Sequence, residues 1–261
     1  MDLLDKIKEE YELCVNKPPE YKERVDSVSN LLGLKGKYKL ISDHCPAYIV
    51  GNYNQANVVF FGLNPGHSDA NSPIEDKEAR ISWNKYQQLY LNFFSYFEKM
   101  GFESPYYTSL WYLLSGLMHN PSGYTISNKW KFFNSYLINM ELIPYHSRGI
   151  ALPARLDDYQ PNYLTERLED NINFITCFKP KVFIFNGSTW YTILIRNGLI
   201  TDFDKVSITD KFNLIFFRVK DIPCVLFDKF IQRHFWGITN DHRRITIPTL
   251  IQEKYPSIIS N

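Results

Sequence analysis

Short apolar runs rich in valine, isoleucine and phenylalanine alternate along this chain with longer segments of helical periodicity. The three clearest runs lie at residues 57–63, 136–142 and 181–185, and two more follow at residues 212–219 and 224–227. The helical patterns cover residues 2–14, 20–32, 82–99, 104–118, 163–177 and 188–197. Strands that are apolar throughout need helices on both faces of their sheet. The alternation therefore predicts an α/β protein with three layers, α/β/α, around a central, mainly parallel sheet.

The length and composition suit one globular domain. The chain has 261 residues, of which 44% are hydrophobic and 22% charged, which is enough apolar material for a substantial core. No linker, repeat or low-complexity segment divides it. We therefore expect a single domain over residues 1–261. Residues 1–50 should pack on it as two helices, separated at Pro18 and Pro19, followed by extended chain or a hairpin at residues 37–50.

Charge and cysteine content exclude several classes of protein. Lys and Arg total 29 against 28 Asp and Glu, so the net charge of +1 argues against a histone-like positive coat but allows a local basic cleft. The four cysteines, which form no CxxC pair and so argue against zinc ribbons and iron–sulfur clusters, are Cys14, Cys45, Cys177 and Cys224. The charged start and short apolar runs argue against a signal peptide or membrane span. We expect a cytoplasmic monomer, associated with the nucleoid in a prokaryote, without cofactor, metal or membrane contact.

Polar side chains follow the first predicted strand. In parallel sheets, ligands bind beyond the carboxyl ends of the strands, so the residues just after each strand are the candidate site residues. Residues 62–67 read GLNPGH, a turn rich in glycine and proline that carries Asn64 and His67. Asn-Pro-Gly is also ordinary turn chemistry, so a purely structural turn stays open at this point.

The second and third strands also end in polar residues. Asn139 and Glu141 are two positions apart in the second strand and so share one face of the sheet. An asparagine in an apolar strand needs a hydrogen-bond partner, which is either structural or a ligand. After the third strand, residues 186–190 read NGSTW, a glycine turn before a helix that Ser188 or Thr189 is expected to cap. Such a helix start could bind a phosphate. Because it lacks the glycines of a P-loop, a purely structural role is the alternative.

A basic and aromatic segment follows the last predicted strand. Its basic residues, rings and histidine are Lys229, Arg233, His234, Phe235, Trp236, Arg243 and Arg244. Basic side chains between exposed rings suit a nucleic-acid backbone and an unstacked base. A solvated helix with a tryptophan packed beneath it is the alternative interpretation.

Taken in order, these segments resemble the uracil-DNA glycosylase superfamily over roughly residues 55–245. The best-known version of its first motif reads GQDPYH, and GLNPGH is similar to the GINPG form of the mismatch-specific uracil/thymine glycosylase branch. Residues 136–144 resemble the strand whose asparagine reads the base edge. Residues 167–187 resemble the helix, KPKV and glycine-ended strand that follow. His234 falls where a second motif, usually HPS, is expected, here followed by Phe-Trp in place of Pro-Ser.

The resemblance implies a monofunctional DNA glycosylase that flips a pyrimidine out of DNA and hydrolyses its N-glycosidic bond. In this assignment Asn64 orients the attacking water, His67 steadies the turn or the water, and His234 donates to the leaving base. The implied substrate-binding residues are Gly62, Leu63, Pro65, Gly66, Trp83, Asn139 and Glu141. The implied DNA-binding residues are Ser188, Lys229, Arg233, Phe235, Trp236, Arg243 and Arg244, with Phe235 or Trp236 as a wedge. No lysine lies in the first motif, so no Schiff base is expected.

The expected substrate is uracil or a C5-modified pyrimidine in DNA. The resemblance puts Gly66 where stringent uracil enzymes have a tyrosine that blocks groups at C5, so glycine leaves space. Asn139 can present its amide to uracil or cytosine, and Glu141 can accept from a cytosine amine. Base-excision repair and defence against phage with modified DNA are both open. The alternatives are a non-catalytic nucleic-acid-binding member of the fold and an unrelated α/β hydrolase or transferase, although GxSxG and HExxH motifs are absent.

Overall fold

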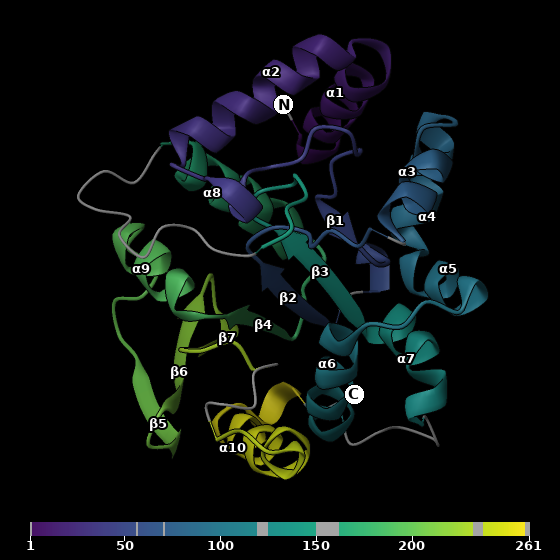
Figure 1. The fold of residues 1–261 in the computed structure, drawn as a ribbon. Coiled ribbons are helices and arrows are strands. Elements are labelled where there is room, and N and C mark those ends of the chain that lie inside the picture. Colours follow the sequence, from purple (N-terminus) through teal and green to yellow (C-terminus); the bar gives the residue numbers. More distant parts are fainter. Residues whose placement is uncertain are drawn as a thin grey trace.

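A computed structural model describes residues 2–55, 57–69, 71–118, 125–149, 162–231 and 237–258 of the chain (Figure 1). Its helices are α1 (Leu3–Asn16), α2 (Pro18–Leu31), α3 (Ser72–Ala79), α4 (Trp83–Leu91), α5 (Phe93–Met100), α6 (Pro105–Leu117), α7 (Lys129–Tyr136), α8 (Asn162–Thr176), α9 (Ser188–Arg196) and α10 (Ile247–Lys254). Its strands are β1 (Ile49–Val50), β2 (Val58–Gly62), β3 (Leu137–Glu141), β4 (Val182–Asn186), β5 (Asp204–Thr209), β6 (Phe212–Val219) and β7 (Ile222–Phe227). The strands form one sheet in the order β1-β3-β2-β4-β7-β6-β5.

The centre of the sheet is parallel and both edges are antiparallel. Strands β3, β2, β4 and β7 pair in parallel, whereas β1 is antiparallel to β3, and β6 is antiparallel to β7 and β5. A two-residue hairpin turn joins β6 to β7 and makes them antiparallel. Lys220 and Asp221 both have positive φ, as such a turn requires. The predicted α/β class with a mainly parallel centre is confirmed, while the sheet as a whole is mixed.

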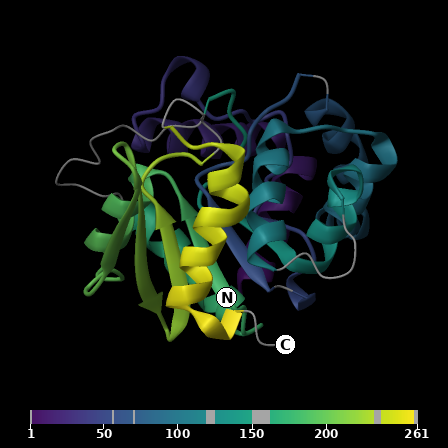
Figure 2. The same ribbon diagram turned by 90° about the horizontal axis from the view of Figure 1, so that it is seen from below.

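Helices lie on both sides of the sheet (Figures 1 and 2). The connection from β2 to β3 carries α3 to α7, and α6 packs against α10. Helix α8 connects β3 to β4 and packs against α1. These two connections run in opposite directions across the sheet, so right-handed crossovers bring their helices to opposite faces. This covers both faces of β2, whose residues from Val58 to Phe61 are fully buried, and is consistent with a three-layer α/β/α fold.

The N-terminal segment packs on α8 through α1. Lys6 Nζ lies 2.7 Å from Asp170 Oδ2 of α8. Pro18 and Pro19 separate the two helices as predicted, and they also begin α2, where their missing N–H groups leave no helical bond unmade. The hairpin alternative for residues 37–50 is wrong, because the strand there is the two-residue β1, which pairs with β3.

Several element boundaries differ from the sequence prediction. The single helix expected at residues 82–99 is two helices, α4 and α5, with Asn92 between them outside helical geometry. Helices α3, α7 and α10 and strand β5 were not predicted; β5 is an exposed edge strand with no apolar run. No helix among the described residues is long and apolar enough to cross a membrane.

Candidate active site

A cavity of about 1050 Å³ lies at the carboxyl ends of the central strands. Gly62, Glu141 and Asn186 end β2, β3 and β4 and line it. The connections that leave β2 and β4 pass to opposite faces of the sheet, and ligands of open α/β sheets bind in the crevice between such connections. Helix α3 forms one further wall, and α6 forms another through Tyr106 and Tyr107.

The turn after β2 lines the cavity over residues 62–68 and is held by the loop after β3. Gly66 forms a parallel bridge with Ser147, whose N–H donates to the Pro65 carbonyl at 3.2 Å. His146 Nδ1 donates to the Gly66 carbonyl at 3.0 Å. Burial lowers the pKa of His146 to about 4, so this ring is neutral at pH 7. The two loops therefore form one rigid rim.

The amide of Asn64 has a fixed orientation in this rim. Its Nδ2 donates to Ser147 Oγ at 2.8 Å and to the carbonyls of Pro65 and Tyr145 at 3.2 and 3.4 Å. Ser147 Oγ donates in turn to the Gly149 carbonyl at 2.5 Å. Because carbonyl oxygens only accept, the amide nitrogen has to face the protein. Asn64 Oδ1 has no partner among the described residues and is left to accept from a molecule in the cavity.

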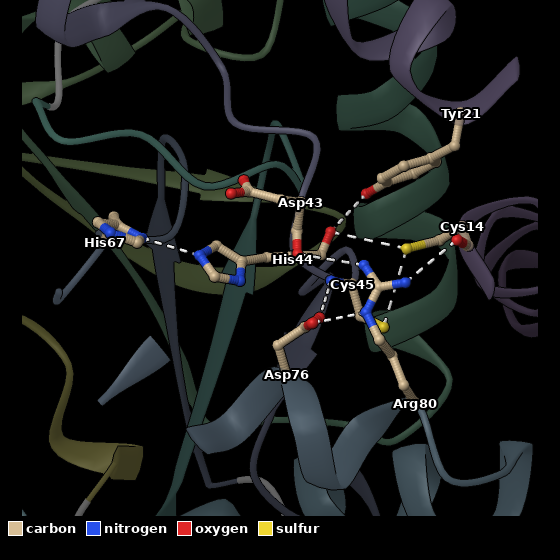
Figure 3. Close-up of polar contacts among 8 residues, drawn as sticks. All are labelled: Cys14, Tyr21, Asp43, His44, Cys45, His67, Asp76 and Arg80. Carbon is tan, nitrogen blue, oxygen red and sulfur yellow. Dashed lines mark hydrogen bonds and ion pairs between the residues drawn. The ribbon is translucent and has the colours of Figure 1, made fainter. Parts of the chain in front are cut away.

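His67 is engaged at both ring nitrogens. Its Nε2 lies 2.9 Å from Asp69 Oδ1, and its Nδ1 lies 3.0 Å from His44 Nε2 (Figure 3). Since a carboxylate only accepts, His67 Nε2 carries the hydrogen and His44 Nε2 donates to His67 Nδ1. Burial lowers the pKa of His44, consistent with the neutral ring that this arrangement needs. Of the two roles predicted for His67, the geometry favours steadying the turn.

A polar cluster holds the residues on either side of His44 in place (Figure 3). The N–H of Cys45 donates to Asp76 Oδ1 of α3 at 2.6 Å. Arg80 Nε donates to the other oxygen of that carboxylate at 2.5 Å, and its terminal nitrogens donate to the carbonyls of Cys14 and Asp43. The cluster thus joins α1, α3 and the segment before β1 to the rim. Sequence reasoning missed it because its members are far apart in the chain.

Asn139 and Glu141 form a hydrogen-bonded pair on the sheet side of the cavity. Asn139 Nδ2 donates to Glu141 Oε1 at 2.5 Å, and the Tyr106 hydroxyl donates to Asn139 Oδ1 at 3.1 Å. In the structure the Asn139 amide nitrogen faces Glu141 and its amide oxygen faces Tyr106. Asn64, Asn139 and Glu141 all line the same cavity, at the carboxyl ends of parallel strands where the candidate site residues were expected.

Glu141 is a buried carboxyl with one unused oxygen. Burial raises its pKa to about 8, and its Oε2 has no partner in the described part of the chain. Gly62 provides the space for this carboxyl, because a Cβ at Gly62 would overlap it. The raised pKa favours the neutral carboxyl at pH 7, and its Oε2 lies buried against Gly62.

Replacing Glu141 by glutamine is expected to flatten the dependence of stability on pH. The folded-state pKa is about 8 against an ordinary value of 4.5, so the stability that the neutral carboxyl allows is full below about pH 4.5 and lost as pH rises through 8. Between pH 5 and 8 the wild-type free energy of unfolding should fall by roughly 3–4 kcal/mol relative to that of Glu141→Gln. Urea unfolding at several pH values measures this, with Glu78→Gln as control. Parallel curves for wild type and Glu141→Gln would contradict it.

One residue assigned to substrate binding lies elsewhere. Trp83 packs against Tyr11 and Tyr86 and does not line the cavity, because it begins α4 on the side facing α1. Ser188, which was assigned to DNA binding and not to the cavity, is exposed at the start of α9. The predicted side-chain cap there is wrong, since the cap is Gly187 with φ 111°, a conformation that favours glycine.

The basic cluster divides into buried and exposed members. Arg243 is fully buried, and its Nε donates to the Ile231 carbonyl at 2.8 Å, so its predicted phosphate contact is wrong. Arg244 is exposed and Lys229 is half-buried. The remaining members of the predicted interface, Arg233, His234, Phe235 and Trp236, lie outside the described residues.

Arg243→Ala and Arg244→Ala are expected to separate stability from DNA binding. Loss of the buried guanidinium, which also donates to Asn240 Oδ1 at 3.0 Å, should lower the free energy of unfolding by roughly 2–4 kcal/mol. Loss of exposed Arg244 should leave stability within about 0.5 kcal/mol but weaken DNA binding and reduce the salt slope by about one contact. Thermal melts and DNA titrations at several salt concentrations test both. Equal effects of the two variants on both measurements would refute the division.

Sequence reasoning missed several residues that surround the predicted ones. Ser147, His44 and Tyr106 hold the predicted residues in place, and Glu75 of α3 lines the cavity. No local motif marks any of them. Within the described ranges, no group of three or more His, Cys, Asp or Glu side chains is suited to hold a metal ion.

No family model matches the chain, and no curated protein is significantly similar to it. The assignment of a function therefore rests on the site itself.

Proposed function

We propose that the chain is a DNA glycosylase, a monofunctional hydrolase that releases a flipped-out uracil or C5-modified pyrimidine and leaves an abasic site. The observation that carries this proposal is that Asn64 and the Asn139–Glu141 pair line one cavity. Asn64 lies in the turn after β2, and the pair lies on β3, the parallel neighbour of β2. One asparagine offers an oxygen to a water molecule. The other, with its carboxyl neighbour, offers donors and acceptors to a flat polar ring.

In the proposed reaction the oxygen of water bonds to C1′ of the deoxyribose, and the bond between C1′ and the base nitrogen breaks. The bonding electron pair leaves with the base, and the water proton passes to the base or to solvent. Asn64 Oδ1 accepts a hydrogen of the water and aims its oxygen at C1′. An amide is too weak a base to deprotonate water, so the bond to the base breaks largely before the water attacks.

The charge that develops on the leaving base needs a donor. Glu141, a cavity-lining carboxyl whose raised pKa favours the neutral form, is proposed as one such donor. His234 is the other in this proposal. It falls in the chain between Phe230 and Asn240, and both of these line the cavity.

The base edge is matched by what Asn139 and Glu141 leave unused. After its contacts with Glu141 and Tyr106, Asn139 keeps one N–H and one lone pair, a donor and an acceptor for a pyrimidine. Neutral Glu141 adds a donor, which suits a carbonyl of uracil or the ring nitrogen of cytosine. Its ionised form would accept from a cytosine amine instead.

The proposed fold is the three-layer arrangement of the uracil-DNA glycosylase superfamily. We propose that the protein acts as a monomer in the cytoplasm. The proposed partner is DNA that contains a damaged or modified pyrimidine, in base-excision repair or in defence against phage. Exposed Arg244, together with Lys229, Arg233, Phe235 and Trp236, is proposed to contact the DNA. Trp83, Ser188 and Arg243 are not part of this proposal.

The function is tested by incubating the protein with oligonucleotides that carry uracil, thymine mismatches or C5-modified cytosines, single- and double-stranded. Alkali-labile abasic sites at the modified position are the expected product. DNA binding without any abasic site would instead identify a non-catalytic nucleic-acid-binding protein. If the protein neither binds these oligonucleotides nor produces abasic sites, the nucleic-acid assignment is rejected altogether.

A further inference from the structure

A second buried carboxyl lines the cavity on the wall formed by α3. Glu75 lies on the buried face of α3 with Ser72 and Ala79, and its residue is 8% exposed. Nothing in the chemistry proposed above uses it. A buried carboxyl normally has a hydrogen-bond or ionic partner, so an unpartnered one that faces a cavity calls for a ligand group.

The polar neighbours of Glu75 are occupied with one another. Ser72 Oγ accepts from the Ser68 N–H at 2.9 Å, and Ser68 Oγ accepts from the Asn71 N–H at 3.2 Å. For Glu75 itself, no hydrogen bond or ion pair occurs with any described residue. Its pKa is raised to about 7 by burial alone, which agrees with the lack of a charged or donating neighbour. Its oxygens are therefore free to accept from a molecule in the cavity.

Glu75 and Glu141 face the same space from different elements. The pKa of Tyr107 on α6 is raised by burial and further by Glu141 and Glu75, so both carboxyls lie near this one ring. The cavity of about 1050 Å³ is at the upper end of the range of roughly 300–1,000 Å³ that holds drug-sized ligands. The cavity therefore has room for a group attached to the base as well as for the flipped nucleotide.

We propose that Glu75 is a specificity-determining residue, which accepts a hydrogen bond from a hydroxyl or amino group on a substituent of the bound base. This rests on the proposed function, in which Asn139 and Glu141 hold the ring itself. The turn that contains Gly66 leads within a few residues into α3, so the side of the pocket that glycine leaves open continues to the wall that carries Glu75. The substrate class is thus a pyrimidine with a donor-bearing group, rather than a plain or merely methylated ring.

The test compares substituents of nearly equal size that differ by one hydroxyl. Oligonucleotides with 5-hydroxymethyluracil or 5-methyluracil, and with 5-hydroxymethylcytosine or 5-methylcytosine, are assayed for binding and for excision. The wild type is expected to favour the hydroxymethyl member of at least one pair by roughly 10- to 100-fold, the effect of a hydrogen bond to a charged or buried group. Glu75→Met, which is apolar and similar in length, should remove that preference.

Two further variants make the result specific. Glu75→Gln keeps one acceptor oxygen and should retain part of the preference. Glu78→Met makes the same chemical change on the outer side of α3, where Glu78 Oε1 lies 3.8 Å from Lys85 Nζ, and should retain all of it. Thermal melts confirm that each variant is folded.

The possible outcomes test the role of Glu75 and the glycosylase activity separately. Excision without a hydroxyl preference, or with a preference unchanged in Glu75→Met, overturns the role of Glu75 and keeps the glycosylase. A Glu75-dependent preference in binding without excision keeps the role of Glu75 and rejects the glycosylase. No binding and no excision with either pair overturns both.

Discussion

Asn64→Ala is expected to lower the rate of base excision by roughly 10²–10³-fold while DNA binding survives. A single positioned hydrogen-bonding group that acts on the reacting atoms is typically worth this much. Asn64 contributes through Oδ1, which has no partner among the described residues, while Nδ2 is anchored to Ser147 and to two carbonyls. Single-turnover excision at saturating protein isolates the chemical step, and a DNA titration measures binding separately.

Ser147→Ala is the matched control for Asn64→Ala. It keeps the Oδ1 atom but removes one of the acceptors that orient the amide, so we expect a smaller loss, about tenfold or less. If both variants turn over at the wild-type rate, Asn64 serves only the turn and the proposed mechanism is wrong. If Asn64→Ala abolishes DNA binding as well, the residue contributes to the interface rather than to the chemical step.

Gly66→Tyr is expected to raise the preference for unsubstituted uracil over bulky C5-substituted bases, measured as a ratio of kcat/KM values, by roughly 100-fold. The position tolerates a side chain, since no described atom beyond its chain neighbours lies within 4 Å of where a Cβ would be, and its φ is outside the left-handed region. The added ring would fill space beside the rim, and a clash that cannot relax costs a few kcal/mol, a hundredfold or more. Ratios of kcat/KM for uracil, thymine and bulky C5-substituted bases measure the effect.

Gly62→Ala provides the contrast within the same motif. A Cβ at Gly62 would overlap the Glu141 carboxyl, so this variant should impair all bases alike instead of selecting among them. A folded Gly66→Tyr protein that processes plain and bulky pyrimidines in the wild-type ratio would show that Gly66 does not border C5. The part of the resemblance that bears on substrate size would then be wrong.

The fold was predictable where apolar burial dominates the sequence. Strands β2, β3 and β4 begin and end within a residue or two of the predicted runs, because strands buried on both faces must be apolar throughout. Strand β5 was missed because its exposed residues carry no such pattern. The break between α4 and α5 was missed because Asn92 interrupts an otherwise continuous periodicity with no glycine or proline to mark it.

The sequence by itself determined the class of the fold and the turn that carries Asn64, since both depend on local chemistry. Only the tertiary structure decided which atoms those residues present. The orientation of the Asn64 amide depends on a loop more than 80 positions away, and the contact between His67 and His44 joins segments 23 positions apart. Likewise, Arg243 appeared basic and exposed in the sequence but is enclosed in the folded chain, while Glu75 gave no signal at all. A side chain's partners and its access to solvent depend on where distant segments pack, and no local pattern of residues encodes this.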